Sequence, residues 1–307
     1  MPTQQRQAAI VGGGIMGGDI AIIFAAGGWQ VHVMSPSQKT RDALPARAAA
    51  GLKKLEAPAT NAALLKTYAK LEDVPLKDVS VVIEAATEDL ALKHKIFADL
   101  ERLAGPDTIL TSNSSTFPVA AIGKGLKTRS RVAGTHFFMP AHMVPLVEIV
   151  SADFTDRRVA ERLIELMREL GKAPIDVTKD VPGFVGNRLQ HALVREALWL
   201  LQNGVTTPEG IDTAVRFGFG FRYIACGPMM QKELSGWDTN LFAATSVYPH
   251  LYNEKGPPPF LKQMVENGHI GMKTKRGLWE WTDETIATEK ARIERCLQAG
   301  MDILKSD

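Results

Sequence analysis

Cysteine is almost absent from the sequence, which has only Cys226 and Cys296 among its 307 residues. Two cysteines cannot form a disulfide framework, and no Cys-x-x-Cys pattern or Cys/His cluster predicts a bound metal. No apolar run is long enough to span a membrane, and the polar first six residues do not resemble a signal peptide. We therefore expect a cytoplasmic protein without a metal centre or a membrane partner.

An excess of one charge is also missing. The chain carries 36 Lys and Arg against 34 Asp and Glu, a formal net charge of +2, so no basic surface for nucleic acid is expected. A chain of this length is long for one hydrophobic core and comfortable for two domains. The expected partner is a small molecule.

The first 180 residues alternate short apolar runs with helix-like segments. We predict strands at 8–11, 31–34, 79–85, 108–111, 131–138, 146–150 and 173–177. We predict helices at 15–26, 90–103, 118–122 and 157–170, and two helical pieces within 38–70, broken near Pro58. This alternation indicates an α/β domain at 1–180, with a doubly wound, mostly parallel sheet and helices on both faces.

The pattern changes near Asp180, beyond which no convincing strand is present. Helices are predicted at 184–202 and 260–267, at 283–305, and from Pro208, where Thr207 is a candidate cap. Residues 181–307 are therefore expected to form a second, all-helical domain. A crevice between two such domains is a common place for a substrate.

A glycine-rich loop follows the first predicted strand, with the spacing G-x-G-x-x-G at Gly12, Gly14 and Gly17. In this pattern the first glycine permits a tight turn, the second lets the backbone approach a pyrophosphate, and the third lets helix and strand pack closely. The next helix begins at Ile15 and Met16 and offers free N–H groups to phosphates. The strand–loop–helix context favours a dinucleotide site over a plain glycine turn.

Ser35 ends the second predicted strand, where an NAD site usually has Asp or Glu on the ribose hydroxyls. Without that carboxylate nothing repels a 2′-phosphate, and Ser35, Ser37, Lys39 and Arg41 are candidate ligands for it. Lys39 and Arg41 are equally typical of solvated charges on a helix. NAD and NADP therefore stand as equal alternatives.

His136 ends one predicted strand, and Glu148 lies inside the next. A carbinol releases hydride only if its hydroxyl proton leaves, and histidine is suited to accept that proton. A carboxylate behind the ring fixes its tautomer and stabilises the imidazolium. Such a pair is often merely structural, but a carboxylate in an apolar strand is costly unless it is paired.

Five further segments carry motifs besides the glycine loop and the His136–Glu148 pair. They are 84–88 (EAATE) followed by Lys93, 111–115 (TSNSS), 136–140 (HFFMP), 146–148 (LVE) and 182–188 (PGFVGNR). In order and spacing, over nearly its whole length, the sequence resembles the 3-hydroxyacyl-CoA dehydrogenase family. The resemblance implies a Rossmann-type fold, a nicotinamide cofactor and a homodimer formed through the helical domain.

The resemblance also implies residue roles. His136 is the general base and Glu148 its partner, while Ser115 and Asn187 donate hydrogen bonds to the substrate oxygen and to His136. Glu88 and Lys93 are implied for the nicotinamide side of the cofactor, and Asn113 is a further candidate for cofactor binding. A helix cap is the alternative for Ser115, and a helix brace for Asn187.

The sequence departs from the family pattern at several positions. Met139 replaces an asparagine, Pro145 replaces a lysine, and residues 220–228 replace a Gly-Tyr-Pro-x-Gly-Pro turn. The segments 145–148 (PLVE) and 218–223 (GFGFRY) resemble the branch containing L-gulonate 3-dehydrogenase (lambda-crystallin) and carnitine dehydrogenase, which act on small free 3-hydroxy acids. Arg222 is a candidate for binding a free carboxylate through paired hydrogen bonds, and a structural salt bridge is its alternative. Met139 is expected at the rim of the substrate site.

Three hypotheses remain. The leading one is an oxidoreductase that acts on the 3-hydroxyl of a small 3-hydroxy acid with NAD or NADP. The second keeps a CoA thioester such as 3-hydroxybutyryl-CoA as substrate. The third is a cofactor-binding protein without turnover, which Met139 alone favours.

Overall fold

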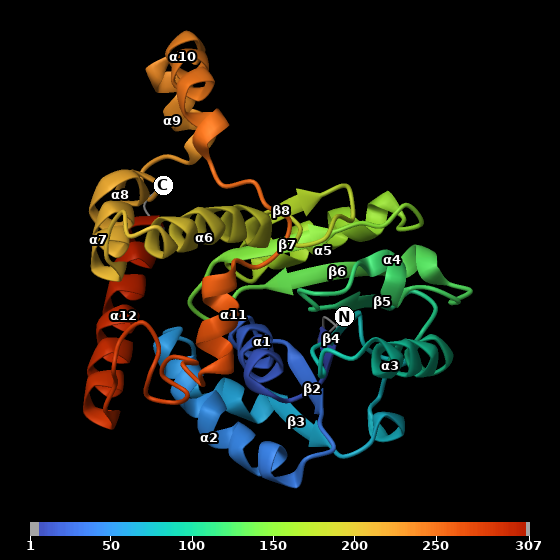
Figure 1. The fold of residues 1–307 in the computed structure, drawn as a ribbon. Helices are drawn as coiled ribbons and strands as arrows, with labels where there is room; N and C mark the ends of the chain where they lie inside the picture. Colours follow the sequence, from blue (N-terminus) through green and yellow to red (C-terminus); the bar gives the residue numbers. More distant parts are fainter. Residues whose placement is uncertain (1–5, 305–307) are drawn as a thin grey trace. The chain divides into compact units, whose positions relative to one another are not determined.

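The computed structural model describes residues 6–304 and divides the chain into two compact units, Met1–Arg188 and Leu189–Asp307 (Figure 1). The division falls eight residues beyond the limit expected from the sequence. The segment 182–188 therefore belongs to the first unit and continues directly into the first helix of the second.

The first unit contains an eight-stranded sheet in the order β3-β2-β1-β4-β5-β6-β7-β8. Neighbouring strands are parallel except β6 and β7, which are antiparallel. This confirms the mostly parallel sheet. The strands are β1 (Gln7–Val11), β2 (Gln30–Met34), β3 (Leu65–Tyr68), β4 (Val81–Glu84), β5 (Ile109–Ser112), β6 (Val132–Phe137), β7 (Leu146–Val150) and β8 (Ala173–Val177).

Helices cover both faces of this sheet, and each face has its own hydrophobic core. Along β1, Ile10 packs into the cluster that contains Phe24 and Leu163, whereas Val11 packs into the cluster that contains Phe97. Burial on both faces explains why the strands read as continuous apolar runs. The helices of this unit are α1 (Ile15–Ala26), α2 (Gln38–Lys54), α3 (Leu90–Leu103), α4 (Val119–Ile122) and α5 (Arg157–Glu169).

The prediction of two helical pieces within 38–70 was wrong in its second half. After α2 the chain forms a 3₁₀ helix, Ala59–Leu64, and then strand β3, which pairs in parallel with β2. The Tyr68 hydroxyl lies 2.9 Å from Nδ1 of His32 on β2. Pairing at the sheet edge outweighs the helical preference of a lysine- and leucine-rich segment that is too short to carry its own signal.

The second unit is helical, as expected, apart from isolated bridges that Arg276 makes to Gly271 and Glu280. Thr207 caps α7 as predicted, because its side chain accepts a hydrogen bond from the Gly210 amide. Two helices between residues 228 and 247 had not been predicted. The helices are α6 (Gly186–Gln202), which begins in the first unit, α7 (Pro208–Thr213), α8 (Gly220–Arg222), α9 (Pro228–Ser235), α10 (Trp237–Val247), α11 (Pro259–Glu266) and α12 (Asp283–Leu304), with a π-helical turn at Ala214–Phe219.

Apolar side chains of the second unit are unusually exposed. Within residues 186–304, no residue of helices α6 to α12 is buried. We define the α9–α10 surface by its exposed apolar residues Met229, Met230, Leu234, Trp237, Leu241 and Phe242. Across residues 6–304, no helix has both the length and the apolar character that a membrane crossing requires.

Candidate active site

The candidate site lies where several strands of the first unit end. The glycine loop follows β1, the segment with Glu88 follows β4, Asn113 to Ser115 follow β5, and His136 lies near the end of β6. Carboxyl ends of parallel strands meet at one edge of a sheet, which is where doubly wound folds bind their ligands. Sheet topology therefore brings together motifs that are far apart in the sequence.

Each glycine of the loop has a distinct steric reason. A Cβ on Gly12, whose φ is +108°, would lie 2.5 Å from the Ala85 carbonyl oxygen, and one on Gly17 would lie 1.7 Å from the Gly12 oxygen. A Cβ on Gly14 would meet nothing within 4 Å. Gly12 and Gly17 are thus required by packing, whereas Gly14 leaves an open space at the start of α1. An approaching pyrophosphate fits that space, so the loop suits a dinucleotide.

The residues that could distinguish NAD from NADP lie at the end of β2. Ser35 is buried, and its carbonyl oxygen accepts a hydrogen bond of 2.6 Å from the Arg41 guanidinium. Arg41 also bonds the side chain of Gln38, while Lys39 is exposed. Each terminal nitrogen of the Arg41 guanidinium therefore has one protein partner.

His136 and Glu148 form a buried pair. They are direct partners in the register of β6 and β7, and His136 Nδ1 lies 2.6 Å from Glu148 Oε2. The Glu148 side chain is fully buried and that of His136 is 6% exposed. Since Nδ1 is engaged by the carboxylate, Nε2 is the nitrogen left for proton exchange.

The start of α6 holds the second oxygen of Glu148. Glu148 Oε1 accepts hydrogen bonds from the amides of Val185, at 2.9 Å, and Gly186, at 2.8 Å. Gly183 and Phe184 precede these amides with φ values of +78° and +48°, a strained conformation for phenylalanine that turns the two N–H groups toward the carboxylate. Burial raises the pKa of Glu148, but these amides and His136 outweigh burial and bring the pKa below its ordinary value.

Two aromatic rings fix the plane of the histidine. The centroid of the His136 ring is 4.6 Å from that of Phe138 and 5.5 Å from that of Phe184. A Cβ on Gly186 would lie 2.5 Å from Cζ of Phe138, so a larger residue there would displace that ring. The segment 182–188 thus supplies the two amides that bind Glu148, the Phe184 ring that contacts His136, and the glycine that leaves room for Phe138.

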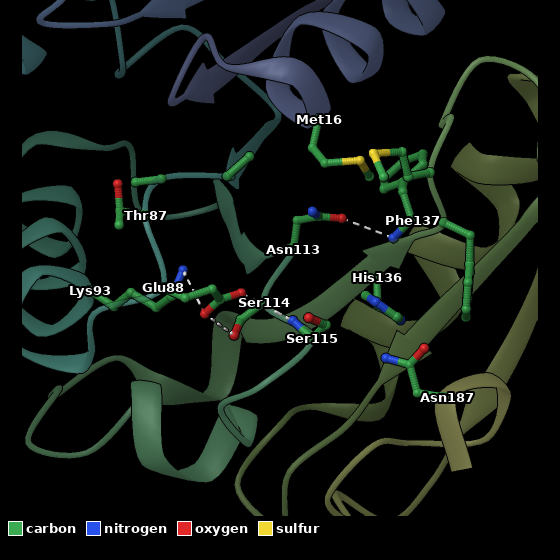
Figure 2. Close-up of a pocket in the computed structure, with 14 residues that line it drawn as sticks. Met16, Thr87, Glu88, Lys93, Asn113, Ser114, Ser115, His136, Phe137 and Asn187 are labelled. Carbon is green, nitrogen blue, oxygen red and sulfur yellow. Dashed lines mark hydrogen bonds and ion pairs between the residues drawn. The ribbon is translucent and has the colours of Figure 1, made fainter. Parts of the chain in front are cut away.

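A cavity of about 450 Å³ opens in front of this pair. Figure 2 shows His136 and Asn187 on one side of it, Glu88 and Lys93 on the other, and Ser115 between them. Met139 is 69% exposed and lines the same cavity. The candidate residues that the structure brings together here are Met16, Glu88, Lys93, Asn113, Ser115, His136, Met139 and Asn187.

The serines after β5 have different neighbours. Ser114 Oγ accepts hydrogen bonds from the amides of Thr116 and Phe117 in the turn before α4, and neither serine caps that helix. Ser115 is exposed and lines the cavity. Asn113 Oδ1 accepts a hydrogen bond from the Phe137 amide at 2.9 Å and so ties the end of β5 to β6.

Two further candidates are not among the residues that line this cavity. Arg222 ends the short helix α8 in the second unit and is exposed, and Ile15 is 66% exposed at the start of α1. Sequence reasoning gave no role to Glu84, a buried residue at the end of β4 that pairs with Lys93. A carboxylate closing an apolar strand was the available signal, as it had been for Glu148.

Comparison with known proteins now gives the family. Residues 7–181 match the model of the NAD binding domain of 3-hydroxyacyl-CoA dehydrogenase, and residues 183–281 match the model of its C-terminal domain. The chain belongs to the 3-hydroxyacyl-CoA dehydrogenase family. This confirms the family predicted from the motifs, the Rossmann-type fold and the class of nicotinamide-dependent oxidoreductase, and of the two cofactors left open the family model names NAD.

Individual relatives differ in how closely they match. The enzyme 5-formyl-3-hydroxy-2-methylpyridine 4-carboxylate 5-dehydrogenase from Mesorhizobium japonicum is 29% identical over 98% of this chain and 98% of its own length. A solved structure of a 5-dehydrogenase for the same compound, described as an NAD+-dependent dismutase, covers 98% of this chain and 99% of that one, with 28% identity and a TM-score of 0.90. The structure of (S)-3-hydroxybutyryl-CoA dehydrogenase from Ralstonia eutropha is 31% identical, covers 91% of this chain and 100% of that one, and has a TM-score of 0.74.

Proposed function

We propose that this protein oxidises the hydroxyl-bearing carbon of a small free acid, with NAD as hydride acceptor and His136 as general base. The observation that carries the proposal is the buried His136–Glu148 pair, in which both oxygens of the carboxylate are hydrogen-bonded. A carboxylate held in this way fixes the imidazole tautomer and favours the charged ring that forms when a proton is taken up. A 3-hydroxy acid is the expected substrate type.

The residues around the cavity suggest how the reaction runs. When bound, the nicotinamide supplies the hydride acceptor. His136 Nε2 takes the substrate hydroxyl proton as the carbon–hydrogen bond breaks, and Glu148 stabilises the resulting imidazolium. Ser115 and Asn187 line the cavity beside His136 and donate hydrogen bonds to the reacting oxygen. In the reverse direction the protonated His136 returns its proton to the carbonyl oxygen.

NAD is proposed over NADP. The family model is an NAD binding domain, and the 5-dehydrogenase structure is described as NAD+-dependent. The hydrogen bonds of Arg41 to Ser35 and Gln38 add support, because they leave fewer guanidinium donors for a 2′-phosphate.

A free acid is proposed over a CoA thioester. The alignment with the relative named for a pyridine carboxylate covers both sequences almost end to end. The solved structure of a 5-dehydrogenase for that compound also has a higher TM-score than the structure of the hydroxybutyryl-CoA enzyme. Met139 and Pro145 replace polar residues of the acyl-CoA pattern, and Arg222 is the proposed partner of the substrate carboxylate. An acyl-CoA substrate is the second candidate, favoured by the family's own name.

A substrate panel tests this proposal. Formation of NADH or NADPH is followed for free 3-hydroxy acids, for carboxylated ring compounds that bear a hydroxymethyl or formyl group, and for CoA esters, each with NAD and with NADP. We expect kcat/KM for the best free acid with NAD to exceed the kcat/KM of every CoA ester, and of every reaction with NADP, by about tenfold or more. A factor of this size corresponds to the free energy of one hydrogen bond to a charged group. Preference for a CoA ester would contradict the free-acid proposal, and no turnover at all would favour a non-catalytic role.

A homodimer and a cytoplasmic location complete the proposal. The exposed apolar side chains of α6 to α12 support self-association, since large exposed apolar patches mark protein–protein contacts. The α9–α10 surface is the proposed contact between two copies.

A further inference from the structure

Lys93 lies at the cavity wall, but its ammonium group is enclosed. Its side chain is 1% exposed, and Nζ lies 2.8 and 2.9 Å from the two carboxylate oxygens of Glu84. Glu84 is itself fully buried. A lysine that contacts a cofactor directly would present Nζ to the cavity, whereas Nζ of Lys93 donates its hydrogen bonds to a buried carboxylate.

Glu84 connects three structural elements. Besides Lys93 of α3, it accepts a hydrogen bond of 2.7 Å from the Ala86 amide in the following loop and one of 2.6 Å from Ser112 Oγ at the end of β5. Every oxygen of this buried carboxylate is therefore satisfied. Asp89 caps the start of α3 by accepting from the Leu92 amide, which fixes the helix turn that carries Lys93.

The same ammonium also faces a second carboxylate. Lys93 Nζ lies 3.7 Å from Glu88 Oε2, and the Glu88 side chain is 40% exposed at the cavity. Glu88 Oε2 accepts a 2.7 Å hydrogen bond from Ser114 Oγ, and Oε1 accepts one of 3.3 Å from the Ser115 amide. One buried cation thus holds, through Glu88, the backbone that carries Ser115 (Figure 2).

We propose that Glu84 and Lys93 are positioning residues that act through Glu88 to fix Ser115 beside His136. The relay runs from Glu84 to Lys93, then to Glu88, and ends at the Ser115 amide. Its catalytic part rests on the proposed function, in which Ser115 donates to the reacting oxygen. Small errors in the placement of such a donor are costly, since a shift of about 1 Å can lower a rate roughly 100-fold.

Stability alone gives no reason for this ion pair. Replacing a buried ion pair by well-packed apolar side chains is often neutral or stabilising, whereas removing one partner leaves a buried charge uncompensated. The informative change is therefore the double variant Glu84→Leu with Lys93→Met, which removes both charges together. Lys95→Met is the matched control, because Lys95 lies on the same helix and is exposed.

Three measurements on the full-length protein test the relay: NAD affinity, steady-state kinetics on the best substrate, and amide hydrogen exchange over residues 113–117. For the double variant we expect a Kd for NAD within about threefold of wild type, a kcat lowered by about 10- to 100-fold, and faster exchange at 113–117. Glu88→Gln breaks the relay at its exposed end and should give the same exchange change even if the double variant fails to fold. Lys95→Met should change none of the three.

Unchanged exchange at 113–117 in a folded double variant or in Glu88→Gln would overturn the relay. A wild-type kcat combined with a more than tenfold weaker NAD affinity would overturn it too, because Lys93 would then serve the cofactor directly. The exchange measurement needs no substrate. If wild type turns over nothing, the proposed function fails while the relay is still tested.

Discussion

At the scale of single residues, hydrogen bonds keep the buried carboxyl group of Glu148 ionised. Glu148 is fully buried, yet its pKa lies below the ordinary value because His136 and two backbone amides bind the ionised form. A carboxyl group with a lowered native pKa stabilises the fold above its unfolded-state pKa, and that contribution is lost as pH falls through the native value. Near neutral pH, Glu148 therefore remains ionised behind the histidine.

At Lys172, in contrast to Glu148, burial outweighs the interactions that favour the charged form. Its ammonium donates hydrogen bonds to the carbonyl oxygens of Ala141, at 2.6 Å, and Val144, at 3.2 Å, in the segment that follows Met139. Burial lowers the pKa of Lys172 from 10.5 to about 8, partly opposed by the charge of Asp19. The native state thus releases this proton at lower pH than the unfolded chain.

Stability should therefore rise with pH in the interval where the two states differ. Between pH 8 and 10.5 the unfolded chain binds more protons at Lys172 than the native state does, so the free energy of unfolding increases with pH. The full shift corresponds to roughly 3 kcal/mol. Urea unfolding of Lys172→Met across this interval should show a flatter pH dependence than wild type, whereas Lys124→Met, at an exposed lysine, should keep the wild-type slope. Equal slopes for Lys172→Met and wild type would contradict the prediction.

At the scale of elements, the glycine loop separates what the fold needs from what the cofactor needs. Gly12 and Gly17 have backbone atoms where a Cβ would go, but Gly14 has a φ of −61° and open space. Gly14→Ala should therefore leave the melting temperature within about 2 °C of wild type, since no contact is lost and no strain arises. It should weaken NAD binding by about tenfold or more, because the methyl group occupies the place of a phosphate.

Titration calorimetry with NAD measures that loss. Gly227→Ala is the control, since Gly227 also has room for a Cβ but lies outside the glycine loop. Unchanged NAD affinity in Gly14→Ala would place the pyrophosphate elsewhere.

The sequence predicted elements with strong local signals and missed those decided by distant contacts. The glycine loop, the apolar strands and the Thr207 cap depend on nearby residues, and their positions agree with the structure. Strand β3 depends on pairing with β2 at the sheet edge. Helices α9 and α10 have exposed apolar residues in place of a clear amphipathic pattern.

The candidate site follows the same division. The His136–Glu148 partnership was predictable because a carboxylate inside an apolar strand needs a partner. The clamp from Val185 and Gly186 depends on a left-handed turn that no local pattern announces. The family resemblance implies that Lys93 lies on the cofactor side, whereas its enclosure by Glu84 depends on the packing of β4 against α3.

At the scale of the whole molecule, the exposed α9–α10 surface predicts self-association. Leu234, Leu241 and Phe242 are 76%, 70% and 77% exposed. Contact with water is unfavourable for such apolar side chains, and a second copy packed on this surface would bury them. Sedimentation of the wild type should give twice the mass of one chain, and its melting temperature should rise with protein concentration.

A paired variant locates the contact. Leu241→Asp with Phe242→Ser should shift the sedimenting species to the monomer and lower the melting temperature, since a charge then lies within the proposed interface. Lys255→Glu, in the loop before α11, should remain dimeric. A monomeric wild type, or a double variant that stays dimeric, would contradict this assignment of the interface.

The central claim is that His136 exchanges the substrate proton during hydride transfer. The most direct test is single-turnover NADH formation by His136→Gln, with the affinity for NAD measured on the same protein. We predict a rate at least about 1000-fold below wild type with NAD affinity within about threefold, because the base is lost while the glycine loop is intact. A His136→Gln variant that transfers hydride at close to the wild-type rate would contradict the account.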